Sequence, residues 1–292
     1  MDTFLRLLGI IAPILAVAGV GFVYGRQHRP DLRWFNRINM DVFVPALMFY
    51  ALAGKEAHLR DYAPLALAGA LIVLGSGVLA WPWCRWANVE WRTLVLPMMF
   101  NNSGNMGLPL LMLAFGEKAL PAAVVLFVVE TSLHFSVGVR LLDARTSWHG
   151  VLKMPVMLAT FAGLVWGLSG VALPAPLAFS MKLLGEASIP VMLFSLGVRL
   201  NDIAWRDWRL GVLGGLLCPA TGLIMAALIR QILPLPPTQQ PILWVFAALP
   251  PAVLNYLLAE QYRQQPQQVA AIVLMGNVFS IFIIPPVLWW AL

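Results

Sequence analysis

The fold is decided by nine residues, Asn101-Asn102-Ser103-Gly104-Asn105-Met106-Gly107-Leu108-Pro109, which interrupt an otherwise apolar segment. Apolar runs flank them at residues 93–100 and 110–115, so the nine residues lie near the middle of a segment long enough to cross a bilayer. Gly104 and Gly107 lower helix propensity, and Pro109 lacks the N–H that would close the preceding turn. A helix broken at membrane depth is tolerated only where protein or a water-filled cavity covers its unpaired backbone groups. The stretch therefore predicts a broken membrane helix beside a cavity.

The composition indicates that lipid is the main solvent of this chain. Of its 292 residues, 60% are hydrophobic and only 11% are charged, and the mean hydropathy is +0.80. A soluble domain averages about 25% charged residues. We therefore expect an all-α integral membrane protein with ten transmembrane helices. The apolar runs place these helices near residues 4–25, 34–54, 63–84, 93–115, 119–142, 150–171, 177–198, 209–231, 239–260 and 267–290.

The basic residues predict the orientation of this multi-pass protein. The net charge is +6, and no basic run interleaved with aromatic residues suggests a nucleic-acid partner. One set of loops contains 13 of the 19 Lys and Arg residues and the other set contains six. The more basic set is Arg26, Arg29, Arg33, Arg37, Arg85, Arg92, Arg140, Arg145, Lys153, Arg199, Arg206, Arg209 and Arg263. Because basic loops stay on the inner side, both termini are expected on the outer side.

The two halves of the chain repeat one another at a shift of 145 residues. The coinciding residues are Pro45 with Pro190, Phe49 with Phe194, Leu113-Ala114 with Leu258-Ala259, and Pro121, Val124 and Val128 with Pro266, Val269 and Val273. We therefore predict two five-helix repeats, residues 1–145 and 146–292. Five is an odd number of spans, so the second repeat would enter the membrane from the opposite side, as in many secondary transporters.

The repeat also predicts a second broken helix, the ninth. The nine residues that open this section map onto residues 246–254, Phe-Ala-Ala-Leu-Pro-Pro-Ala-Val-Leu. Pro250 and Pro251 interrupt that span, and Asn255 follows within about one turn. Interrupted segments at corresponding positions of two halves are the best sequence-level indication of a transporter binding site.

Three segments resemble the auxin efflux carrier family. They are Asn102–Pro109 in the fourth span, Ile189–Gly197 in the seventh and Pro250–Tyr262 in the ninth. The resemblance covers essentially the full chain, and it implies ten spans in which helices 4 and 9 cross at their breaks. It also implies a fold shared with sodium-coupled bile-acid symporters. The long hydrophilic central loop of the plant carriers is missing, so the chain resembles the bacterial members of the inner membrane, which are associated with small carboxylates such as malonate and malate.

The breaks supply candidate substrate ligands. Pro109 and Pro251 suit the first turn of a new half-helix, whose N-terminal end carries a partial positive charge and free N–H donors. We expect Asn105 and Asn255 to contact the substrate, with Asn102 and Ser103 as secondary candidates. The full candidate site is Asn101, Asn102, Ser103, Gly104, Asn105, Pro109, Pro250, Pro251 and Asn255. The structural alternative is that the asparagines only bond neighbouring helices, since Gly and Pro are common in membrane helices in any case.

Glu130 lies near the centre of the fifth span, where a carboxylate is unfavourable unless it is neutral, paired or hydrated. His134 is four residues further along the same helix face, and Thr131 is adjacent. These three residues are candidates for ion or proton coupling. The alternative is a protonated Glu130 bonded to a backbone carbonyl. The second half has Met275 at the position of Glu130, so the pair is not duplicated.

We therefore expect a secondary active transporter of a small organic anion, such as malonate, malate or an auxin-like acid, that works by alternating access. The alternatives are a sodium-coupled symporter of the bile-acid type and a membrane sensor that has lost transport. An enzyme is not expected, because the sequence has no Gly-x-Ser-x-Gly motif, no Asp-rich diphosphate site and no His-x-x-x-His spacing. The expected partners are the substrate anion, H⁺ or Na⁺, the lipid bilayer and a second copy in a homodimer, with no nucleic acid, cofactor or metal site.

Overall fold

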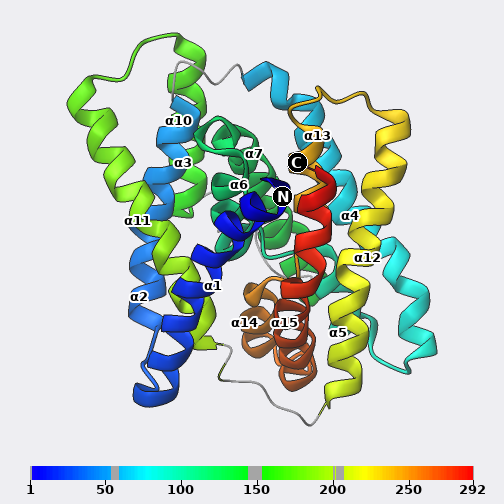
Figure 1. Ribbon diagram of the computed structural model, residues 1–292. Coiled ribbons are helices and arrows are strands. Elements are labelled where there is room, and N and C mark those ends of the chain that lie inside the picture. The colour runs from blue at the N-terminus through cyan, green and yellow to red at the C-terminus, as the bar shows by residue number, and fades with distance from the viewer. Residues whose placement is uncertain (1, 54–58, 144–152, 200, 202–206, 292) are drawn as a thin grey trace.

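The computed structural model describes all residues except 1, 54–58, 144–152, 200, 202–206 and 292. The described residues form helices joined by short connections, with no strand longer than an isolated bridge (Figure 1). The first half contains α1 (Asp2–His28), α2 (Arg33–Ile38), η1 (Asn39–Phe43), α3 (Val44–Ala53), η2 (Leu59–Tyr62), α4 (Ala63–Trp86), α5 (Trp91–Met99), η3 (Ser103–Gly107), α6 (Leu108–Phe115), η4 (Glu117–Ala119), α7 (Leu120–Leu133), η5 (His134–Gly138) and α8 (Val139–Leu142). The second half contains α10 (Pro155–Ser169), α11 (Ala175–Arg199), α12 (Trp208–Ile232), α13 (Gln240–Ala247), α14 (Val253–Gln261) and α15 (Pro266–Ala291).

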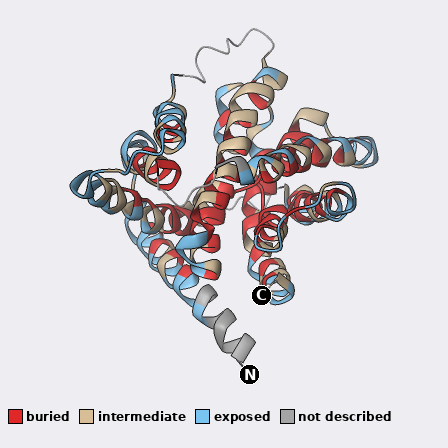
Figure 2. Cartoon of the chain, turned by 90° about the horizontal axis from the view of Figure 1, so that it is seen from above, coloured by how far each residue is buried: buried red, intermediate tan, exposed pale blue. Residues whose placement is uncertain are grey.

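The helices pack as two groups. One group contains α1, α3, α10 and α11, which pack mainly on one another. The other contains α4, α5, α7, α12, α14 and α15, with α12 packed along both α15 and α4. The groups meet where α11 touches η3, α3 touches α7 and α1 touches α6 and α15. Figure 2 shows that buried residues gather toward this centre, while exposed residues lie on the outer helix faces.

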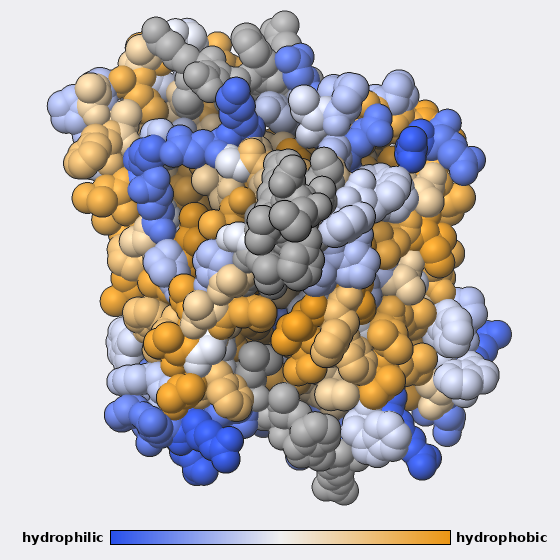
Figure 3. All heavy atoms as spheres, viewed as in Figure 1, coloured by the Kyte–Doolittle hydropathy of each residue, from blue (hydrophilic) through white to orange (hydrophobic). Residues whose placement is uncertain are grey.

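The surface has the polarity of a membrane protein. Figure 3 shows hydrophobic residues across the middle of the molecule and hydrophilic residues gathered toward its upper and lower edges. Large apolar side chains on the outer faces are well exposed, for example Val78 at 73%, Phe161 at 69% and Phe282 at 71%. Five helices of the described residues are long and apolar enough to cross a membrane: Ala63–Trp86, Glu117–Leu142, α11, α12 and α15. The protein is therefore a multi-pass, all-helical membrane protein over its described residues.

The helix ends follow from local chemistry. Gly116 (φ 75°) ends α6 and Gly170 (φ 70°) ends α10, both with a positive φ that glycine adopts without strain, and Gly170 is in the left-handed helical conformation. Pro64 and Pro121 lie in the first turns of α4 and α7, where a missing N–H costs no hydrogen bond. Pro109 is the second residue of α6, but α6 continues directly from η3, so Pro109 lies in the second turn of the half-helix that begins at Ser103. The predicted start of the sixth span at residues 150–152 and the predicted boundary between residues 145 and 146 fall outside the described residues.

Both predicted interruptions are present, but their positions differ from the sequence expectation. The first covers residues 100–102, between α5 and η3, so Gly104, Gly107 and Pro109 belong to the following half-helix. The second covers residues 248–252, and Pro250 and Pro251 lie in the interruption itself, before α14 begins at Val253. The expectation that Pro251 sits in a first helical turn is therefore wrong. Pro251 is instead held in an extended bridge with Asn101, in which neither partner is helical.

Candidate functional site

The two interruptions lie against each other and are joined by backbone hydrogen bonds. The N–H of Asn102 donates to the carbonyl of Pro250 at 2.7 Å, and the N–H of Ala252 donates to the carbonyl of Phe100 at 2.9 Å. These bonds flank the antiparallel bridge between Asn101 and Pro251. Each broken helix thus satisfies backbone groups of the other, which is the condition for irregular backbone inside a membrane.

The side chains of two predicted site asparagines stabilise this contact between the interruptions with further hydrogen bonds. The side-chain amide of Asn101 donates to the carbonyl of Phe246 at 2.8 Å. The amide of Asn255 donates to the carbonyls of Phe100 at 2.8 Å and Ala252 at 3.1 Å. Because these NH₂ groups already bind carbonyls, Asn255 has no amide hydrogen left for a substrate carboxylate. Both side chains keep a buried carbonyl oxygen, Oδ1, that has no hydrogen-bond partner among the described residues.

Asn277, in the middle of α15, also forms hydrogen bonds to the interruptions. Its side-chain oxygen accepts from the amide of Asn102 at 3.0 Å, and its own amide donates to the carbonyls of Pro251 at 3.2 Å and Val273 at 2.7 Å. One residue therefore binds both interruptions. Asn277 is not among the residues that the sequence predicted for the site. A single buried asparagine in an apolar helix gives no sign of which neighbours it will contact.

Glu130 and His134 lie at the first interruption. The hydroxyl of Ser103 donates to Oε2 of Glu130 at 3.0 Å, and the hydroxyl of Thr131 does so at 3.4 Å. Nδ1 of His134 is 3.3 Å from Oε1 of Glu130, within ion-pair distance but at an angle that does not form a hydrogen bond. The His134 ring stacks on Phe100, with centroids 4.0 Å apart and the planes 5° from parallel.

These contacts show that Glu130 and His134 face the same way, and they connect the pair to the first interruption. Glu130 is 4% exposed and His134 is 2% exposed. Glu130 contacts two hydroxyl donors and an imidazole, whereas the structural alternative required a backbone carbonyl. Hydroxyl donors suit an ionised carboxylate as well as a neutral one, so this arrangement is compatible with a change of charge at Glu130.

A cavity of about 210 Å³ lies beside the interruptions. It is lined by the start of the first half-helix at Gly104 and Asn105, the start of α14 at Val253 and Leu254, and the pair Glu130–His134. Among the described residues that line it, Arg199 at the end of α11 is the only lysine or arginine. Asn36, Asn39 and Asp41 from the α2–η1 segment line it as well. Asn39 and Arg199 were not predicted as site residues, because they lie far along the chain from the two interruptions.

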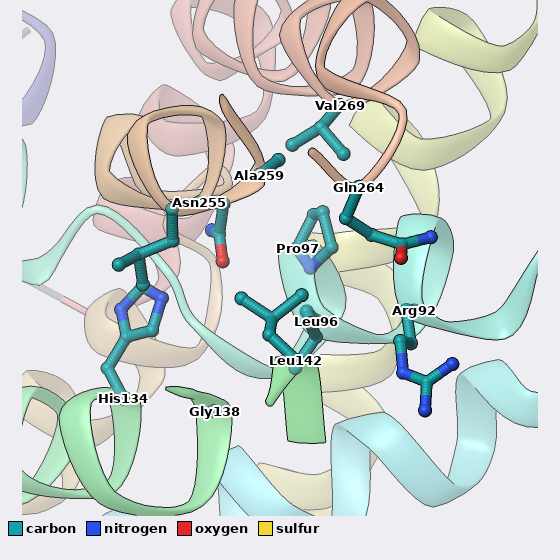
Figure 4. A pocket seen from close by; sticks show the side chains of 11 residues that line it. Arg92, Leu96, Pro97, His134, Gly138, Leu142, Asn255, Ala259, Gln264 and Val269 are labelled. Carbon is teal, nitrogen blue, oxygen red and sulfur yellow. The ribbon is translucent and has the colours of Figure 1, made fainter. Parts of the chain in front are cut away.

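A second, much smaller cavity of about 10 Å³ also borders His134 (Figure 4). His134 and Asn255 line one end of it, and Arg92 and Gln264 line the other, with Leu96 and Leu142 between them. Arg92 is fixed there by bonds to the carbonyl of Leu141 at 2.8 Å and to Glu90 at 3.2 Å. His134 lines both cavities.

Comparison with known proteins agrees with this architecture. The family model described as "Membrane transport protein" matches the chain twice, over residues 7–147 and 144–288. The chain belongs to this family. The resemblance to the auxin efflux carriers is thereby confirmed, and the family consists of transporters rather than enzymes.

Relatives of this membrane transport protein have similar lengths. A Rhizobium meliloti (strain 1021) protein named "Putative malonate transporter" is 24% identical over 305 residues, covering 94% of this chain and 93% of the relative. An uncharacterized transporter of Methanocaldococcus jannaschii is 22% identical and covers 98% of both chains. The uncharacterized transporter YfdV of Escherichia coli K12 is 22% identical over 66% of this chain and 68% of its own.

Proposed function

We propose that this protein is a secondary active transporter of a small organic anion, a carboxylate such as malonate, malate or an auxin-like acid. In this proposal it works by alternating access where the fourth expected span (α5, η3 and α6) crosses the ninth (α13 and α14). The observation that supports the proposal most strongly is the mutual hydrogen bonding of the two interruptions beside a cavity of about 210 Å³. A densely packed core without a binding site would not be expected to interrupt two helices where they contact each other. The name of the Rhizobium relative favours a dicarboxylate among the candidate anions.

Anion binding follows from the helix ends at the cavity. The first N–H groups of a helix have no intrahelical acceptor, and they carry the positive end of the helix dipole. Both half-helices present such ends, at Ser103–Asn105 and at Val253–Leu254, and residues from both line the cavity. The side chain of Asn105 has no hydrogen-bond partner among the described residues, so its amide can donate to a carboxylate. Arg199 adds a positive charge to the lining of the same cavity.

The proposed substrate contacts differ from those expected from the motif. Asn105 remains the principal contact, together with the backbone at Gly104. Asn101, Asn102, Asn255, Pro250 and Pro251 hold the crossing in shape, and Pro109 supports the half-helix that presents Asn105.

A cation is the proposed co-substrate, because acceptor oxygens line the same cavity. Oδ1 of Asn39, Oδ1 of Asn101 and Oε1 of Glu130 are buried and have no hydrogen-bond partner among the described residues. Oxygen acceptors repel a carboxylate but stabilise H⁺ or Na⁺. We propose H⁺, since Glu130 and His134 can take up and release a proton together. Na⁺ is the second candidate, with Thr131 as a further oxygen ligand.

We also propose ten spans arranged as two inverted repeats, about residues 1–145 and 146–292. The double family match supports this division. The positive-inside count supports outer termini, and the bacterial relatives support a bacterial inner membrane location. In that orientation the larger cavity lies toward the inner side, because Arg199 and the α2–η1 segment that line it adjoin inner loops.

The test is uptake of radiolabelled malonate into proteoliposomes that contain the purified protein. We expect saturable uptake by the natural sequence, and loss of uptake in Asn105→Ala with little change in thermal stability, because Asn105 makes no structural hydrogen bond. Uptake by Asn105→Ala at the normal rate would disprove the site. A folded protein that binds malonate without flux would instead be a sensor.

Coupling is tested in the same vesicles with imposed gradients. We expect a pH gradient to drive uptake in the natural protein and not in Glu130→Gln, whose amide cannot exchange a proton. A sodium gradient is the control. Uptake that follows sodium and keeps an unchanged pH profile in Glu130→Gln would assign Na⁺ as the coupling ion.

A further inference from the structure

We propose that the small cavity is a water site through which protons reach His134 by a route separate from the substrate cavity. This inference rests on the proposed proton coupling at Glu130 and His134. It concerns the path of the proton, and it assigns a role to the cavity of Figure 4 that the larger cavity does not explain.

The cavity has the size and the polar partners that one water molecule needs. Its volume is about 10 Å³, close to that of a single water-sized probe. Oδ1 of Asn255 is a buried acceptor with no hydrogen-bond partner among the described residues, and Asn255 lines this cavity and not the larger one. The Asn255 amide is fully engaged with backbone carbonyls, so Oδ1 is the atom that can bind a water there.

His134 supplies the second partner. Its Nδ1 faces Glu130, which leaves the opposite edge of the ring, with Cδ2 and Nε2, for the small cavity. Consistent with this, a Cβ at Gly138, which also lines the cavity, would lie 3.1 Å from Cδ2 of His134. A water at Asn255 Oδ1 can therefore take the proton of a protonated Nε2 and pass one of its own protons toward the end of the cavity at Arg92. Uptake is the reverse transfer.

The far end of the cavity reaches the surface. Arg92 there is 38% exposed on its side chain, whereas the side chain of His134 is 3% exposed. The charge of Arg92 is offset by Glu90, which lies 3.2 Å away and also accepts from Gln264 at 2.6 Å. The ionisable groups around His134 are Glu130 on its own helix, Arg92 and Glu90 across the small cavity, and Asp41 and Arg199 around the larger cavity.

The proposal is tested by deuterium exchange at C2 of the histidine rings, measured by mass spectrometry on the intact detergent-purified protein. This exchange requires both water access and protonation of the ring, and it requires no substrate. Two matched pairs separate the routes. Val269→Leu and Leu258→Phe enlarge side chains that line the small cavity, whereas Val253→Leu and Leu257→Phe enlarge side chains that line the larger one.

We expect His134 to exchange in the natural protein, and several-fold more slowly in Val269→Leu and Leu258→Phe. Exchange in Val253→Leu and Leu257→Phe should match the natural protein. Two independent substitutions at each cavity keep the test valid where one variant does not fold. Slower exchange in the larger-cavity variants, equal slowing in both pairs, or no exchange at His134 would overturn the separate route. Because no transport is measured, absence of malonate uptake would count against the proposed function and not against this inference.

Discussion

Replacement of Asn255 separates a structural role from a substrate-binding role. In Asn255→Ala the two amide hydrogen bonds to the carbonyls of Phe100 and Ala252 are lost. Each carbonyl keeps a backbone partner, since Phe100 still accepts from the N–H of Ala252 and Ala252 from the N–H of residue 255. Neither is left unsatisfied, so the loss is the net value of two bonds, about 1–3 kcal/mol in total.

Asn255→Asp should be worse than Asn255→Ala. It places carboxylate oxygens against the same two carbonyls, so acceptors face acceptors. The assay is the apparent unfolding temperature in one detergent at one scan rate, because membrane proteins often unfold irreversibly. We expect the natural protein and Asn105→Ala to be most stable, then Asn255→Ala, then Asn255→Asp. If both Asn255 variants unfold at the same temperature as the natural protein, the Asn255 side chain does not stabilise the contact between the two interruptions.

Two further predictions concern packing and the surface. Gly276→Ala should destabilise the protein by about 1–3 kcal/mol, because a Cβ there would lie 2.5 Å from Cδ of Pro251. Gly19→Ala is the matched control for the same unfolding measurement, because a Cβ at Gly19 meets no atom within 4 Å. Lys182→Met should leave the unfolding temperature unchanged, although Lys182 lies 2.9 Å from Glu117, because their side chains are 34% and 67% exposed. A large drop for Lys182→Met, or equal effects of the two glycine substitutions, would contradict these assignments.

The sequence was sufficient to predict the two interrupted helices and the buried pair Glu130–His134. Clustered Gly, Pro and Asn in an apolar run conflict with a continuous membrane helix, and that conflict is local. The exact break was not predictable. The motif suggested a break at Gly104–Pro109, but the chain leaves the helix at residues 100–102, where hydrogen bonds from residues 250–252 replace the helical ones. That exchange depends on a partner 150 residues away.

The same reason explains the roles of individual side chains. Asn105 and Asn255 look alike in sequence, yet the amide of Asn255 is engaged by two carbonyls while that of Asn105 faces the cavity. Asn39, Arg199 and Asn277 reach the site from helical segments outside the two interruptions. Only packing between the two helix groups shows that they belong to it.

The most direct test of the central claim, a carboxylate site at the crossing, is the thermal stability of the purified protein with malonate, malate and an aromatic carboxylate. A ligand that binds only the folded state stabilises it by mass action, by about 2.7 kcal/mol at one hundred times its Kd. We predict a higher unfolding temperature with at least one carboxylate and no such increase in Asn105→Ala. The same increase in Asn105→Ala, or none with any carboxylate, would contradict the claim.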